Sequence, residues 1–128
     1  MRNFIVSIFI LVGFIFPSAS FASHLELSEC VEIGHCVREE WEVSSIEQPF
    51  KDIKEIIENS PRSVIVDIDG DYLHAEVTSK WMKYVDDLEV SFIPESSKLL
   101  VRSESRVGES DLGVNQKRVD LLKSKLFK

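Results

Sequence analysis

The chain has 128 residues, with 15 basic and 22 acidic side chains and a formal net charge of −7 at neutral pH. This acidity argues against nucleic acid as a partner and against general adhesion to anionic lipid. The length fits one compact domain.

The N-terminus has the pattern of a secretory signal. Arg2 precedes an apolar run from Phe4 to Phe16, and small residues follow it. The run is shorter than the roughly 20 residues that cross a bilayer, so a removable signal over residues 1–22 is predicted. Cleavage is expected after Ala22, with Ala19 as the competing position and an uncleaved membrane anchor as the alternative. The protein is therefore expected to be exported, periplasmic or secreted, with no membrane span after cleavage.

Cys30 and Cys36 are the only cysteines. In an exported chain, two nearby cysteines most often form a disulfide, which would here pin an irregular N-terminal arm over residues 23–45. A redox-active pair is less favoured because the spacing is not Cys-x-x-Cys. A metal site with His24 and His35 has suitable ligand types but matches no zinc spacing, so we expect no metal and no cofactor.

Residues 46–128 have the periodicity of one α+β domain. Apolar residues at helical spacing from Phe50 to Ile57 predict a helix that begins at Pro49 and ends before Pro61. Trp41, in the preceding arm, is a candidate for the core.

Four strands follow, each with alternating or β-branched residues. They are predicted at Ser63–Ile68, Asp71–Thr78, Val85–Ile93 and Lys98–Glu104. Asp69-Gly70 is a hairpin signal, and Val64, Val66 and Ile68 are expected on one face of the first strand. Trp81 and Tyr84, in the link between the second and third strands, are expected to cover a sheet edge or the rim of the core.

A second amphipathic helix is predicted over residues 115–127, with Asn115 as its N-cap. The order is then α-β-β-β-β-α. Because the links are short, we expect a single antiparallel four-stranded sheet with both helices packed on one face.

Alternation places a polar set on the sheet face opposite the apolar one: His74 and Glu76, Asp87 and Glu89, Arg102 and Glu104. Neighbouring strands would bring these side chains within about 5 Å of one another. The favoured interpretation is a solvated face with weak ion pairs. The alternative is a polar site in which His74 carries protons near neutral pH. No nucleophile motif accompanies it.

A calcium site is a further alternative, because Asp67, Asp69 and Asp71 alternate along the chain. The run lacks the ligand series and closing glutamate of a calcium-binding loop, and a hairpin turn accounts for it.

The stretch from Arg102 to Arg118 is the part least explained by ordinary folding needs. Its arginines could form a structural clasp with Asp86, Asp87 or Asp111, which is favoured because a long loop must satisfy its backbone groups. The alternative is an anion site for a carboxylate or phosphate, with serine hydroxyls and a helix start as donors. The candidate residues for either role are His74, Asp86, Asp87, Arg102, Ser105, Arg106, Asp111, Asn115 and Arg118.

Several motifs follow one another along the chain: DYLHAE at 71–76, VDDLE at 85–89, RSESRVG at 102–108 and DLGVN at 111–115 with Arg118, preceded by a Cys-x5-Cys-Val element at 30–37. Together they resemble the domain of unknown function family 1499. The resemblance covers Cys30 to Phe127. It implies a shared fold and an uncharacterised role, and it makes the arginine-rich stretch an expected feature.

We therefore expect an exported, single-domain, non-enzymatic binding or accessory module of the cell envelope, with a small anionic ligand or an envelope protein as partner. The alternative is a small enzyme that acts on an anionic substrate through His74, Asp87 and the Arg102 and Arg106 cluster. A third interpretation is that the motif residues only stabilise the fold, so that Arg106→Ala would lose several kcal/mol.

Overall fold

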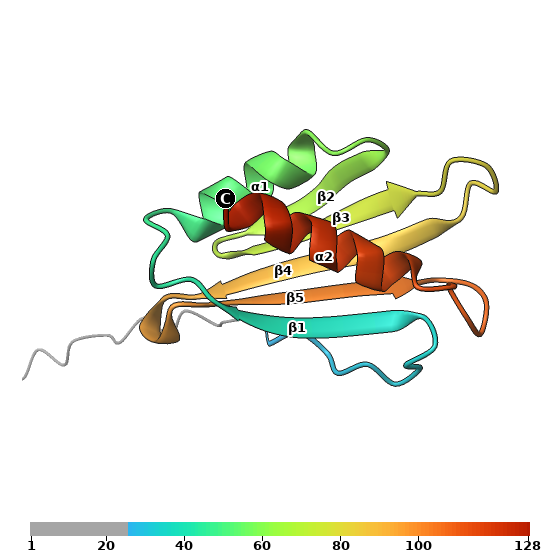
Figure 1. The fold of residues 1–128 in the computed structure, drawn as a ribbon, viewed down its shortest axis with the longest axis horizontal. Helices are drawn as coiled ribbons and strands as arrows, with labels where there is room; N and C mark the ends of the chain where they lie inside the picture. Colours follow the sequence, from blue (N-terminus) through green and yellow to red (C-terminus); the bar gives the residue numbers. More distant parts are fainter. Residues whose placement is uncertain (1–25) are drawn as a thin grey trace, which may run out of the picture.

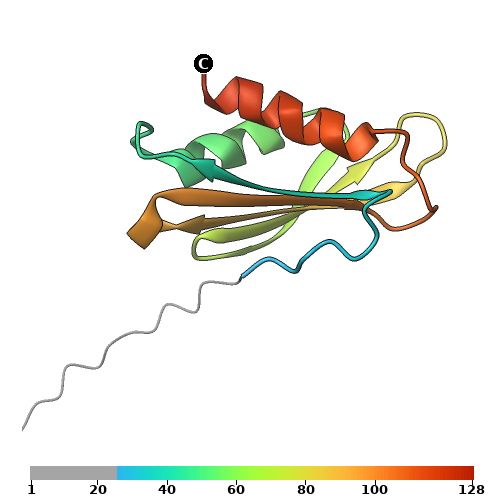
Figure 2. The same cartoon turned by 60° about the horizontal axis from the view of Figure 1, so that its bottom comes forward.

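A computed structural model describes residues 26–128 and shows one sheet with both helices across one of its faces (Figure 1). The elements in chain order are β1 (Cys36–Glu42), α1 (Pro49–Glu58), β2 (Ser63–Asp69), β3 (Tyr72–Thr78), β4 (Val85–Ile93), the 3-10 helix η1 (Pro94–Ser96), β5 (Lys98–Ser105) and α2 (Val114–Leu126). The segment before β1 runs along the opposite face of the sheet (Figure 2). The expected signal, residues 1–22, lies outside the described residues, as does His24.

The sheet has five antiparallel strands in the order β1-β5-β4-β3-β2. The predictions of an α+β fold, one antiparallel sheet and two helices are confirmed, but the prediction of four strands was wrong. The additional strand, β1, lies in the arm that we expected to be irregular. It pairs with β5 along its whole length, from Cys36 opposite Glu104 to Glu42 opposite Lys98.

Glu39 is the reason why the alternation of β1 is hard to recognise. It takes a position between Val37 and Trp41, which pack toward the helices. Its carboxylate accepts a hydrogen bond from Trp41 Nε1 at 2.7 Å and another from Gln116 of α2 at 3.0 Å. A charged side chain therefore interrupts the apolar pattern and is satisfied by tertiary contacts that the sequence does not reveal.

The hairpin between β2 and β3 forms where Asp69-Gly70 predicted it. Asp69 pairs with Tyr72, which leaves a two-residue loop with Gly70 at φ +56°. Val64, Val66 and Ile68 do not share one buried face, however. A β-bulge between Ile65 and Asp67 shifts the register of this edge strand, and Ile65 is the residue that packs against the core.

The core fills the space between the sheet and the two helices. Its buried members include Leu73, Ala75, Leu88, Val90, Leu99 and Val101 from the sheet, with Ile53, Ile57, Val119 and Leu122 from the helices. Trp41 is 2% exposed, as expected for a core residue, and its ring contacts Phe127 edge to face at 6.3 Å between centroids. The alternation predicted for β3 is confirmed by its burial, and that of β4 is confirmed from Asp86 to Val90, after which Ser91, expected on the polar face, is 1% exposed.

Three loops lie at the end of the sheet away from η1 (Figures 1 and 2). They are residues 30–35 before β1, residues 79–84 between β3 and β4, and residues 106–113 between β5 and α2. The predicted disulfide between Cys30 and Cys36 is present and closes the first loop. Neither helix within residues 26–128 has the length and apolar character needed to cross a membrane.

Candidate functional site

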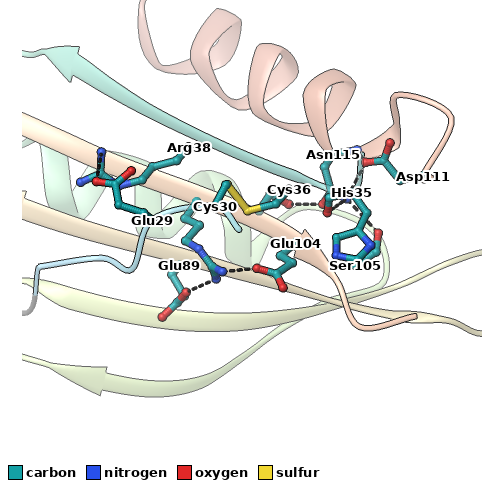
Figure 3. Close-up of a disulfide and its surroundings, with 12 residues drawn as sticks. Glu29, Cys30, His35, Cys36, Arg38, Glu89, Glu104, Ser105, Asp111 and Asn115 are labelled. Carbon is teal, nitrogen blue, oxygen red and sulfur yellow. Dashed lines mark hydrogen bonds and ion pairs between the residues drawn. A yellow bond between two sulfur atoms is a disulfide. The ribbon is translucent and has the colours of Figure 1, made fainter. Parts of the chain in front are cut away.

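A buried polar network lies beneath the start of α2, centred on Asn115, which has no exposed surface. Its side-chain amide nitrogen is shared among three acceptors: Asp111 Oδ2 at 2.7 Å, Ser105 Oγ at 2.8 Å and the carbonyl oxygen of His35 at 3.1 Å. Figure 3 shows these residues converging beside the disulfide. One amide therefore joins the first loop, strand β5 and the loop before α2.

Arg118 completes this network from the next turn of α2. Its Nη1 donates to Asn115 Oδ1 at 2.8 Å and to Ser103 Oγ at 2.9 Å, and its Nη2 donates to Asp86 Oδ2 at 2.7 Å. Ser103 also donates to Asn115 Oδ1 at 2.6 Å. Asp86 is buried, and the guanidinium group of Arg118 compensates its charge. Without this partner, the buried carboxylate would be strongly destabilising.

Asp111 holds the start of α2. Its carboxylate accepts hydrogen bonds from the backbone N–H groups of Gly113 at 2.8 Å and Asn115 at 3.0 Å. The prediction that Asn115 is the N-cap was wrong: Gly113 takes that position at φ +80°, and the Asn115 side chain turns inward. Partial burial raises the pKa of Asp111, but the hydrogen bonds from Asn115 and Gly113 outweigh it and lower the pKa below its ordinary value.

The disulfide-closed loop packs directly against residues 106–111. Gly34 O accepts from the Asp111 N–H at 3.0 Å, His35 O accepts from the Ser105 N–H at 2.9 Å, and His35 Nδ1 donates to Gly108 O. A Cβ atom at Gly34 would collide with the backbone oxygen of Glu109. Glycine is therefore needed here for the two backbones to approach so closely.

A second polar cluster lies on the sheet face opposite the helices, which we call the open face although the segment before β1 runs along it and Ser91 and Leu100 are buried there. His74 Nε2 and Arg106 Nη2 both hydrogen-bond Asp87 Oδ1, at 2.7 and 2.8 Å. Arg106 also reaches Asp87 Oδ2 at 2.9 Å and Glu76 Oε1 at 2.8 Å. The hydrogen bonds from Arg106 lower the pKa of Asp87, partial burial opposes this effect, and His74 adds to it, so the group is held as a carboxylate.

Arg102 lies on the same face and forms ion pairs within the polar set predicted there, but not the pair predicted for a clasp. It donates to Glu89 Oε2 at 3.0 Å and also pairs with Glu104, so the expected bond to Asp86, Asp87 or Asp111 is not formed. Tyr72 donates its hydroxyl to Glu89 Oε1 at 2.9 Å. Burial raises the pKa of Tyr72, and the hydrogen bond to Glu89 raises it further.

The nine candidate residues therefore do not form one site. Asp86 and Asp87 are neighbours in β4, and strand alternation turns them toward opposite faces of the sheet. On the helix-covered side lie Asp86, Ser105, Asp111, Asn115 and Arg118; on the open face lie His74, Asp87, Arg102 and Arg106. The His35 carbonyl belongs to the buried network although the sequence did not single it out. The Ser103 hydroxyl, one of the serine donors considered for an anion site, bonds to Asn115 and Arg118 instead.

A groove of about 790 Å³ lies between residues 79–84 and residues 106–113. Its floor includes Asp86, Ser105 and Asp111, and its walls are largely apolar: Trp81, Met82, Tyr84, Val107, Leu112 and Val114. The groove thus joins one edge of the buried network to the solvent.

Trp81 and Tyr84 do not cover a sheet edge or the core, which corrects the prediction. Their side chains are 83% and 49% exposed. The exposure of Trp81 could have been predicted from the lysines at 80 and 83, because charged residues on both sides keep a short loop exposed to water.

Within residues 26–128, no three His, Cys, Asp or Glu side chains are arranged to hold a metal ion. Both cysteines are in the disulfide, so the thiolates considered for a metal site are not available. The buried network, the open-face cluster and the groove are the arrangements from which a function can be argued.

The family model for proteins of unknown function (DUF1499) matches residues 26–126. No curated protein matches the chain. The matched range contains all five strands, both helices and the residues of both polar clusters. The chain belongs to the DUF1499 family.

Proposed function

We propose that the chain is an exported, non-enzymatic binding module of the cell envelope, and that its binding site is the groove between residues 79–84 and 106–113. The observation that carries the proposal is the groove itself, with its apolar walls and polar floor. Ligand sites are commonly concave and mostly apolar, with a few polar groups that fix orientation. Large exposed apolar groups in a cluster also favour an interaction surface.

The ligand proposed for the groove is apolar and is not an anion held by arginine. Each arginine of the 102–118 stretch already meets a carboxylate: Arg102 with Glu89 and Glu104, Arg106 with Asp87 and Glu76, Arg118 with Asp86. The carboxylates of Asp86 and Asp111 in the floor are engaged by Arg118 and by backbone N–H groups. Binding energy would therefore come from burial against the apolar walls.

A neutral fluorescent dye, N-phenyl-1-naphthylamine, tests the groove. Its emission should rise on binding to the wild-type chain, and Trp81→Ser or Leu112→Ser should weaken the affinity by about tenfold or more, since each substitution removes a large apolar contact. Val64→Ser is the matched control, because Val64 is also exposed but lies on β2, outside the groove. Equal affinity in all four proteins would contradict the proposal.

The open-face cluster favours a second candidate function, a small enzyme that acts on an anionic substrate. The specific observation is that His74 and Arg106 share one oxygen of Asp87, which sets a proton carrier beside a cation. The test is turnover of a panel of phosphate monoesters and of carboxylic esters that carry a free carboxylate. Activity that His74→Ala abolishes and that Asn59→Ala leaves intact would support this candidate, and absence of turnover by the wild type would remove it.

A further inference from the structure

The most exposed large apolar side chains of the described residues share a location. Val31 is 88% exposed, Ile33 and Leu112 are each 87% exposed, and Trp81 is 83% exposed. Met82, beside Trp81, follows at 65%. All five lie on the three loops at one end of the sheet. We define them as the apolar end.

Hydrogen bonds join two of the three loops of the apolar end, and the groove separates the third loop from them. The backbone of Gly34 and the ring of His35, in the loop of Val31 and Ile33, hydrogen-bond to Asp111 and Gly108. Residues 79–84 and 106–113 face each other across the groove. Figures 1 and 2 show from two directions that the three loops project from the same end of the molecule.

The charges around Trp81 suit a membrane surface. Lys80 and Lys83 flank Trp81 and Met82, and Lys80 Nζ lies 5.0 Å from the centre of the Trp81 ring. Tryptophan is enriched at the level of lipid headgroups, and lysine can extend its ammonium group to the phosphates while its stem stays in apolar surroundings. Glu32 and Glu109 in the other two loops balance the lysines, so lipid of net negative charge is not required.

The shape of the apolar end also favours a bilayer over a protein. A specific protein interface needs a closely packed, complementary core. Here the apolar side chains stand on separate loops around a groove, so a rigid partner would contact the tips and leave the space between them unfilled. A fluid bilayer adapts to separate tips and needs no complementary shape.

We propose that the apolar end inserts into the headgroup region of a zwitterionic lipid bilayer. The inference rests on the proposed function, because Trp81, Met82 and Leu112 belong to both the groove and the apolar end. With the apolar end in the bilayer, the groove lies next to the lipid phase, which is a source of the apolar groups that we propose as its ligands.

Quenching of tryptophan by brominated lipid tests the insertion on the full chain. Phosphatidylcholine vesicles with brominated acyl chains should quench part of the emission that ordinary phosphatidylcholine vesicles leave intact. The quenched part should come from Trp81, because Trp41 is buried. Trp81→Phe should therefore abolish the difference between the two kinds of vesicle. This readout reports on Trp81 itself, whatever the N-terminal segment does.

Two further variants measure the strength of the contact. Val31→Ser combined with Leu112→Ser keeps Trp81 and should weaken partitioning of the Trp81 signal by about tenfold or more. Val64→Ser, the matched control on β2, should behave as the wild type. High salt and added anionic lipid should change the affinity little, because the loops carry balanced charges.

Equal emission of the wild type with brominated and ordinary vesicles would overturn the inference, and so would binding that requires anionic lipid. The neutral dye separates this failure from that of the proposed function. If the dye still binds the groove while vesicles do not quench Trp81, only membrane docking is wrong. If neither occurs, both proposals are wrong.

Discussion

The two faces of the sheet contain the same kind of ion pair in different surroundings. Asp86 pairs with Arg118 at 2.7 Å on the helix-covered side, and its neighbour Asp87 pairs with Arg106 at 2.8 Å on the open face. The side chains of the first pair are 8% and 15% exposed, whereas those of the second are 27% and 44% exposed. Nearly equal distances thus hide unequal roles, because water competes with the second pair and hardly with the first.

The difference in exposure indicates that the buried cluster stabilises the fold, whereas the cluster on the open face is accessible to water and to a ligand. Asp86 and Arg118 lie within a network that also satisfies Asn115 and Ser103, so removal of one partner leaves buried groups without a hydrogen bond. The ion pair between Asp87 and Arg106 can be replaced by contacts with water or with a ligand, with a smaller loss of free energy. The following substitutions test this contrast, from the largest expected effect to the smallest.

Arg118→Ala should have the largest effect on stability. It leaves the Asp86 carboxylate buried and unpaired, which typically costs about 3–5 kcal/mol. The measurement is the free energy of unfolding in urea. Asp86→Leu combined with Arg118→Met should lose much less, since no buried charge is left. Exposed ion pairs contribute less than about 1 kcal/mol. If Arg118→Ala lowers the free energy of unfolding by no more than that, the two faces do not differ in the way proposed.

Removal of the disulfide should come next. Cys30→Ser combined with Cys36→Ser should lower the free energy of unfolding by roughly 2 kcal/mol, which is the chain-entropy effect of so short a loop. Amide hydrogen exchange should also accelerate at Ser105 and Asp111, whose N–H groups donate to His35 and Gly34 of the closed loop. Amides of β3 should keep their protection. Uniform acceleration across the sheet would contradict a local role.

The pH dependence of stability should reveal the carboxylate of the open face. Because the pKa of Asp87 is lowered in the folded state, its contribution is fully present above the unfolded value of about 3.8 and is lost as pH falls through the folded pKa. Urea midpoints between about pH 5 and about pH 2.5 should fall less steeply for Asp87→Asn than for the wild type. Parallel curves would show that the ion pair with Arg106 does not affect folding.

Arg106→Ala should have the smallest effect. Its guanidinium group is exposed, and the partners that it leaves, Asp87 and Glu76, remain accessible to water. The melting temperature should therefore stay near that of the wild type. A decrease as large as that of Arg118→Ala would instead support the interpretation that the motif residues only stabilise the fold.

Most of the fold could be predicted because apolar periodicity survives in most elements. β3 and β4 alternate cleanly, and α1 repeats its isoleucines at helical spacing. β1 could not be predicted because Glu39 occupies an inward position and is satisfied by Trp41 and Gln116. The formation of β1 therefore depends on tertiary contacts that the sequence pattern does not show.

The polar clusters could be predicted in part. The pairs of Asp86 with Arg118 and of Asp87 with Arg106 were among the partners considered, because alternation and charge restrict the choices. The hydrogen bond from Asn115 to the His35 carbonyl could not be predicted, because it joins backbone to side chain across 80 residues of sequence. The exposure of Trp81 was also not predicted, because a tryptophan between two strands is usually expected to pack against the core.

Gly34 has a consequence for how this surface can be recognised in other chains. Any side chain at that position would push residues 30–35 away from Glu109. Val31 and Ile33 would then move away from Leu112, and the apolar end would lose the alignment of one of its three loops. A related chain with another residue at this position can keep the sheet, the helices and the buried network, yet it cannot assemble the same apolar end. A single glycine thus distinguishes sharing the fold from sharing the surface.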